Sequence, residues 1–163
     1  MRWWAGKIRR LVRHVRGRVT LAEMAGLDDM LTPPQLELFK QMQKGDQRHG
    51  LDVMAALRET GHRDPDLLMA ALLHDAAKGP AVRLWHRIAW SLADRYGAWV
   101  FRVARLLPGA ERGFDEIRHH AERSAVLALA AGCSPLTADL IRHQAEPRDE
   151  ALGVALLVAD QAN

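Results

Sequence analysis

The sequence contains a single cysteine, and this scarcity sets the first limits on the protein. Cys133 has no partner for a disulfide within the chain, which is typical of proteins that fold in a reducing compartment. One thiol also cannot supply the closely spaced thiolates of a zinc finger, so Cys133 is interpreted as a small packing residue. We therefore expect a cytoplasmic protein that is stabilised by an ordinary hydrophobic core.

Sustained alternation of apolar and polar residues, the pattern typical of β-strands, is also missing. Uninterrupted apolar stretches of membrane-spanning length are missing too, since Arg87, Asp94 and Arg95 interrupt the longest helical pattern. A chain of 163 residues with 48% hydrophobic and 26% charged residues is long enough to bury a core. We predict an all-α protein with one compact helical domain over residues 20–163.

Residues 1–18 contain no acidic side chain but carry seven arginine and lysine residues. Subtracting these seven charges from the net charge of +3 leaves −4 for the rest of the chain, so the basic character belongs to this segment. Apolar residues recur between the basic ones at helical spacing, which predicts an amphipathic helix over residues 2–16 within an N-terminal segment of residues 1–19.

Three roles are considered for this basic helix. We favour packing against the domain, with the arginines in water. The alternative is peripheral contact of residues 1–18 with the inner membrane surface, because Trp3 and Trp4 suit the headgroup region. Nucleic-acid binding is disfavoured, since no recognition motif accompanies the charge. The segment has no uninterrupted apolar region and no cleavage-like site, so we expect no secretory signal in it.

Capping residues, prolines and glycines divide the remaining sequence into helices. Thr20 and Thr32 each begin a capping box, Asp46 can cap the helix that follows it, and Gly97 predicts a break. The predicted helices cover residues 21–30, 33–43, 46–60, 65–78, 80–107 with the break at Gly97, 114–131, 135 to before Pro147, and 149–161.

One apolar run ends abruptly in ionisable residues. Residues 67–73 are apolar and belong to the helix predicted over 65–78, and His74 and Asp75 follow them directly. A buried aspartate is rare unless it is paired or binds a cation. On a continuous helix, Lys78 would lie on the same side as both residues. An imidazole, a carboxylate and an ammonium group at one place suit a metal ion and an anionic substrate.

Further histidines and one aspartate lie on other predicted helices. Asp160 follows the apolar residues 156–159, as Asp75 follows its own apolar run. Mixed imidazole and carboxylate ligands suit iron, manganese, nickel, cobalt or zinc in an open catalytic site. The candidate metal ligands are His49, His74, Asp75, His119 or His120, His143 and Asp160.

In helical surroundings, this pattern resembles the HD-domain superfamily of metal-dependent phosphohydrolases. Residues 72–79, Leu-Leu-His-Asp-Ala-Ala-Lys-Gly, are similar to the LLHDIGK signature of that superfamily. The resemblance covers about residues 46–161 and implies a helical bundle with a metal site at its centre.

The resemblance also implies individual roles. Asp75 would bridge two metal ions where two are present. His120, preferred to His119 because of its spacing to Ser124, and His143 would reach the second ion. Lys78 would act in catalysis together with Asp75, by attracting the phosphate and stabilising developing charge. The four ligands of the basic family site correspond to His49, His74, Asp75 and Asp160.

The expected function is hydrolysis of a phosphomonoester or phosphodiester in a small, nucleotide-type substrate. The expected cofactor is a divalent metal, with two ions of iron or manganese favoured over nickel, cobalt, zinc or magnesium, which activates water for the attack. Gln144 stands where the HD-GYP subgroup carries a second histidine, which disfavours a cyclic di-GMP phosphodiesterase. A di-iron oxygenase on the same fold and a non-catalytic regulatory module remain as alternatives. The oligomeric state is left open.

Three tryptophans lie in the segment that follows the signature. Trp85, Trp90 and Trp99 recur among other apolar residues at helical spacing, which favours packing in the core. The alternative is that they line one wall of a substrate cleft.

Overall fold

The computed structural model describes residues 17–163, and all regular secondary structure in this range is helical, as predicted. The helix predicted over residues 2–16 lies outside the described residues. In chain order the helices are α2 (Leu21–Asp28), α3 (Pro33–Gln41), α4 (Lys44–Glu59), α5 (Pro65–Leu73), α6 (Leu84–Tyr96), α7 (Trp99–Ala104), α8 (Ala110–Ala130), α9 (Pro135–Arg142) and α10 (Leu152–Ala162).

Several helix boundaries are set by capping interactions that the sequence predicts. Thr20 Oγ1 accepts a hydrogen bond from Glu23 N at 3.2 Å, and Glu23 Oε2 accepts one from Thr20 N at 2.9 Å, which completes the predicted capping box. Asp64 caps α5 through Leu67 N at 3.0 Å. Gly97 has a φ of 100° and separates α6 from α7, because L-residues with side chains rarely adopt that conformation.

Several expected helix starts are wrong, since the helices predicted from residues 80 and 149 begin at Leu84 and Leu152. Asp46 does not cap α4, which begins two residues earlier, at Lys44. The Asp46 side chain is buried and pairs with Arg87 of α6 instead, at 2.7 Å from Oδ2 to Nη2. The helix predicted from residue 114 begins at Ala110, so α8 has an additional turn at its start.

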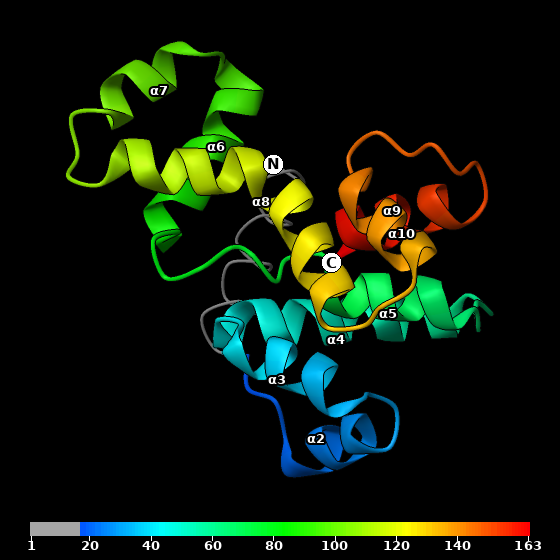
Figure 1. Cartoon of the computed structure of the whole chain (residues 1–163). Helices are drawn as coiled ribbons and strands as arrows, with labels where there is room; N and C mark the ends of the chain where they lie inside the picture. Colours follow the sequence, from blue (N-terminus) through cyan, green and yellow to red (C-terminus); the bar gives the residue numbers. More distant parts are fainter. Residues whose placement is uncertain (1–16) are drawn as a thin grey trace.

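The larger core forms around α5. Leu67, Leu72 and Leu73 are completely buried, and α5 packs against α4, α9 and α10 (Figure 1). The alanines of the C-terminal half of α8 complete this core, while α3 covers one end of it. A short apolar helix in the middle of the bundle therefore carries the signature residues into the interior.

A second lobe projects from this bundle and is built from α6, α7 and the first part of α8 (Figure 1). Trp90 and Phe101 meet edge to face at 5.2 Å between ring centroids, and Phe114 of α8 packs against both. Trp85 packs against the same cluster. Trp85 and Trp90 therefore pack in the core of the lobe, which is the role that the sequence favoured. Trp99 differs, since it is 54% exposed.

Helices α4 and α5 approach each other most closely at Gly50. A Cβ atom at this position would lie 2.6 Å from the carbonyl oxygen and 3.2 Å from the carbonyl carbon of Leu72. Both atoms belong to the backbone of a buried helix and cannot turn aside. Glycine therefore sets the distance between the two helices, and this distance positions His49 beside His74.

We expect Gly50→Ala to lower the free energy of unfolding by about 1–3 kcal/mol, because the added methyl group forces α4 and α5 apart. The matched control is Gly26→Ala in the exposed part of α2, where a Cβ atom would meet nothing within 4 Å. That variant should gain about 0.5–1 kcal/mol from helix propensity. Urea unfolding measures both, and equal stabilisation by the two substitutions would contradict the packing argument.

Candidate metal centre

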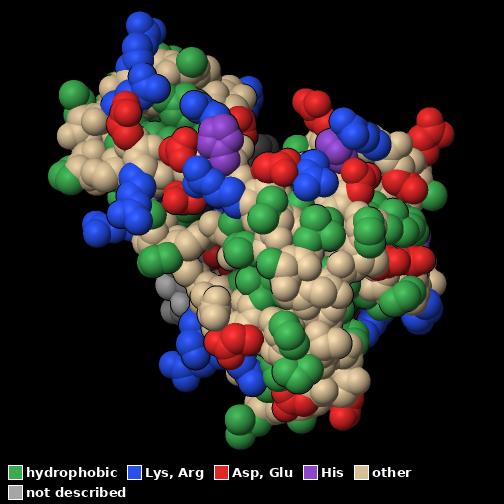
Figure 2. All heavy atoms as spheres, in the orientation of Figure 1, with side chains coloured by type: hydrophobic (Ala, Val, Ile, Leu, Met, Phe, Trp, Pro, Cys, Tyr) green, Lys and Arg blue, Asp and Glu red, His purple; other side chains and the backbone are tan. Residues whose placement is uncertain are grey.

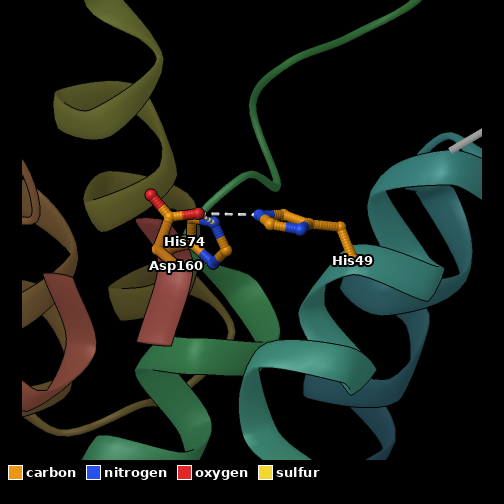
Figure 3. A group of neighbouring side chains, drawn as sticks. All are labelled: His49, His74 and Asp160. Carbon is orange, nitrogen blue, oxygen red and sulfur yellow. Dashed lines mark hydrogen bonds and ion pairs between the residues drawn. The ribbon is translucent and has the colours of Figure 1, made fainter. Parts of the chain in front are cut away.

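Three of the predicted ligands form one group at the centre of the bundle. His49 comes from α4, His74 follows α5, and Asp160 lies near the end of α10, with their side chains directed toward one another (Figure 3). Asp160 Oδ1 lies 2.8 Å from His49 Nε2 and 3.7 Å from His74 Nε2. Their ligand atoms all lie within 4.8 Å of one another. Atoms that each lie about 2.1 Å from one ion are separated by roughly 3–4 Å, so this group can close around a metal.

Asp75 joins a second group beside the first. Its Oδ1 atom lies 3.6 Å from His74 Nε2 and 3.4 Å from His120 Nε2, while its Oδ2 atom accepts a bond from Lys78 Nζ at 2.7 Å. The two groups therefore meet at the contact between His74 and Asp75. Both side chains are almost entirely buried, whereas that of Lys78 is 18% exposed.

The helix predicted over residues 65–78 ends at Leu73, which corrects the expected geometry. His74 is the C-terminal cap, and residues 74–77 form turns in which Lys78 N donates to Asp75 O at 3.0 Å. Lys78 thus reaches Asp75 through a turn and not along a helix face.

The backbone fixes the orientation of two imidazoles. His74 Nδ1 lies 2.9 Å from the carbonyl oxygen of Ala71, and His120 Nδ1 lies 2.6 Å from that of Ile117. A carbonyl oxygen only accepts hydrogen bonds, so each Nδ1 carries a proton and Nε2 is the nitrogen that can bind either a second proton or a metal ion. Carbonyl acceptors of this kind orient metal-bound histidines in proteins.

Two of the atoms at the junction lack hydrogen-bond partners. His74 Nε2 and Asp75 Oδ1 are fully buried and unpaired, although unpaired polar atoms in an interior cost free energy. Two electron-pair donors 3.6 Å apart repel each other unless a cation or a proton lies near both. The residues present therefore fit a metal ion.

The pKa values show which ligands hold protons when metal is absent. Burial lowers the pKa of His74, but the negative charges of Asp75 and Asp160 outweigh it and raise the pKa to about 9. Burial and the Lys78 charge lower the pKa of His120 to about 4. Although burial acts in the opposite direction, the Lys78 and His74 charges hold the pKa of Asp75 well below its usual range. Burial raises the pKa of Asp160, but its hydrogen bonds with His49 and His74 outweigh burial and hold this pKa far below its usual value.

The remaining histidine candidates have their ion-pair contacts with aspartates outside these groups. His119 is half exposed, and its Nε2 atom lies 3.4 Å from Asp115 on the same helix. His143 caps the end of α9, where its buried Nε2 atom lies 3.4 Å from Asp139. Within the described residues, His120 thus contacts Asp75, whereas the ion-pair contact of His143 is to Asp139.

The turn after His74 is held by three polar residues that sequence reasoning did not assign to the site. Ser124 Oγ accepts from Ala77 N at 2.9 Å, and Gln144 Nε2 donates to His74 O at 3.3 Å. Gln43 Nε2 donates to Lys78 O and Gly79 O at 2.8 and 2.7 Å. Of these three residues, only Ser124 could have been linked to the site from the sequence, because it follows His120 by four residues and so lies on the same side of α8.

Comparison with family models, with curated proteins and with solved structures finds no match to this chain. Among the described helices, none combines the length and the apolar character that crossing a membrane requires. The assignment of the site therefore rests on its geometry and on the sequence pattern.

We expect His49→Asn, His74→Asn and Asp160→Asn to lower bound manganese strongly after reconstitution, because each removes a ligand from the central group. His120→Asn should lower the stoichiometry or the affinity of a second ion. His119→Asn is the matched control, since this neighbouring side chain faces Asp115. Elemental analysis with circular dichroism measures both metal content and folding. Full metal content in the His74 variant would contradict the assignment.

Metal affinity should weaken as the pH falls. His74 is protonated at neutral pH in the metal-free protein, since its pKa is about 9, and metal binding at Nε2 must expel that proton. The apparent dissociation constant of manganese should therefore rise by about tenfold for each pH unit below 9, for one displaced proton. Calorimetric titrations across this range measure the slope. A constant affinity between pH values of about 9 and 7 would show that His74 is not a ligand.

Proposed function

We propose that this protein is a metal-dependent phosphohydrolase with a site for one or two divalent ions. The observation that supports it best is the buried contact of His74 Nε2 with Asp75 Oδ1, in which neither atom has a hydrogen-bond partner. The ammonium group of Lys78 lies beside this contact, bonded to the other oxygen of the Asp75 carboxylate. A cation site adjoining a fixed positive charge suits an anionic substrate such as a phosphate ester.

The residues present divide into two sets of metal ligands. His49, His74 and Asp160 would hold the first ion, and Asp75 and His120 would hold a second beside it, favoured as iron or manganese. When bound, such ions polarise phosphoryl oxygens and lower the pKa of water so that a nucleophile forms at neutral pH. His143, which pairs with Asp139, would have to change its partner to take part as a ligand.

Lys78 is assigned to the substrate. Its side chain is partly exposed and can therefore meet a ligand from solvent, whereas Asp75 beneath it is buried. Hydrogen bonds from Gln43 to the carbonyl groups of Lys78 and Gly79 hold the backbone at this point. A charge that is already in place loses little free energy to reorganisation when negative charge develops on phosphoryl oxygens.

The substrate class that we propose is a small phosphorylated molecule of nucleotide type. It rests on the sequence resemblance and on the single ammonium group at the site. Arg48, which precedes His49, is already bonded to Glu23 at 2.6 Å and to Asp52 at 2.9 Å, so its charge is committed to the packing of α2 on α4. Lys78 has one carboxylate partner, Asp75, whereas Arg48 has two, so Lys78 is the cation that we assign to the phosphate.

Lys78→Ala should reduce kcat/KM on an anionic phosphate ester by roughly 10²–10³, the usual effect of removing one fixed donor to developing charge. The metal content should not change. Lys78→Arg should restore activity only in part, because a planar guanidinium replaces a compact charge. The assay is a panel of phosphomonoesters and phosphodiesters with manganese, iron, nickel, cobalt, zinc and magnesium.

Lys40→Ala is the control for this substitution, since Lys40 is an exposed lysine of α3. Loss of metal together with activity in Lys78→Ala would make Lys78 structural. Absence of hydrolysis with every metal would overturn the proposal and favour the non-catalytic module. Oxygen consumption by an iron-loaded protein without phosphate release would favour the oxygenase.

A further inference from the structure

The outer edge of the second lobe carries large apolar side chains in water. The edge consists of the end of α6, α7 and the turn that follows, residues 95–109. In Figure 2 the second lobe, at the upper left of the molecule, shows hydrophobic and basic side chains at its surface together with a few acidic ones. Its exposed apolar residues are Tyr96 at 48%, Trp99 at 54%, Val103 at 59%, Leu106 at 84% and Leu107 at 50%.

These side chains are not needed by the core of the lobe. Val100 and Ala104, on a neighbouring face of α7, are buried and belong to the same cluster as Phe114. The lobe therefore satisfies its core with one face of α7 and presents another apolar face to solvent. Several large apolar groups that gather on one surface are typical of an interaction site.

Within residues 95–109 every formal charge is positive, and the exposed acidic residues Asp94 and Glu111 lie just outside this range. Residues 95–109 contain Arg95, Arg102 and Arg105 and no acidic residue. Arg105 has a distant ion pair with Glu111, at 3.5 Å, in which both side chains are largely exposed. The apolar surface is thus flanked by three cations, which suits a partner that is apolar inside and anionic at its surface.

We propose that this edge docks onto the surface of an anionic lipid bilayer. Tryptophan and tyrosine side chains favour the interface between headgroups and acyl chains, where Trp99 and Tyr96 would lie. Leu106 and Leu107 stand on a projecting turn and would enter the acyl region, and the arginines would meet anionic headgroups.

The charge pattern disfavours a second copy of the chain as the partner. In a two-fold symmetric contact the same surface meets itself, so the arginines of both copies would lie close together. The basic residues 1–18 form an independent candidate for membrane contact in the sequence. The proposal for residues 95–109 stands on their own exposure and charge, and its test separates the two segments.

The first test measures binding of the full chain to vesicles of phosphatidylcholine, with and without phosphatidylglycerol, by co-sedimentation. The protein should bind the anionic vesicles and be released at high salt. Leu106→Ser combined with Leu107→Ser should weaken binding by about tenfold or more, the equivalent of one apolar side chain withdrawn from the acyl region. Arg102→Glu should weaken it as well.

Matched controls are Leu129→Ser, an exposed leucine of α8 outside the lobe, and Lys40→Glu, which changes the net charge as Arg102→Glu does. Both should bind as the unaltered chain does. Unchanged binding by the variants at residues 102, 106 and 107 would overturn the proposal and leave residues 1–18 as the contact. Circular dichroism establishes that each variant is folded.

A second test locates the contact. An environment-sensitive dye on Leu106→Cys should shift to the blue when phosphatidylglycerol vesicles are added, while the same dye on Leu129→Cys should not. Cys133 is buried, so labelling favours the introduced thiols. No shift at position 106, or equal shifts at both positions, would contradict docking through this edge. Self-association that is lost in the Leu106 and Leu107 variant would identify a second copy as the partner instead.

Discussion

The burial of a carboxylate beside an imidazole at the end of α5 is the constraint on which the rest of the structure depends. Asp75 and His74 are each only 2% exposed, and an uncompensated charge at such a place costs several kcal/mol. The fold compensates by directing Lys78 and His120 toward Asp75, and His49 and Asp160 toward His74. Three helices, α4, α8 and α10, and the segment that follows α5 supply these partners. The packing of the bundle thus surrounds the His74–Asp75 dipeptide with side chains that can pair with its charges.

Helix α8 connects this site to the second lobe. Its first part contributes Phe114 to the core of the lobe, and its second part contributes His120 and Ser124 to the site and alanines to the main core. The buried pair of Asp46 and Arg87 forms another connection, between α4 and α6. The lobe is therefore attached at α4 and α8, which also carry the candidate ligands His49 and His120. If the lobe docks on a bilayer, the site is carried to the membrane surface with it.

Two features of the site support each other although they have different physical origins. Backbone carbonyl groups determine which nitrogen of His74 and His120 is free, through hydrogen bonds within single turns of the chain. The convergence of those nitrogens on Asp75 depends on the position of α8 beside the turn that follows α5, where Ser124 Oγ accepts a hydrogen bond from Ala77 N. Local structure thus prepares each ligand, and tertiary packing assembles the ligands into a site.

The sequence by itself determined the helical class and most helix boundaries, because capping residues, prolines and glycines act within a few positions of the chain. It also singled out the candidate ligands His74, Asp75 and Asp160, since ionisable residues that directly follow apolar runs can be recognised from the sequence alone. It placed Lys78 near Asp75 for a reason that proved wrong, because a turn and not a helix joins them.

Only the tertiary structure decided the distances between residues that are far apart in the chain. It selected His120 over His119 as the neighbour of Asp75, and it turned Asp46 from an expected cap into the partner of Arg87. It also showed that the three tryptophans have different environments: Trp85 and Trp90 pack in the lobe, whereas Trp99 is exposed to solvent. Helical spacing alone leaves such choices open, since it shows which residues share a face but not which neighbour covers that face.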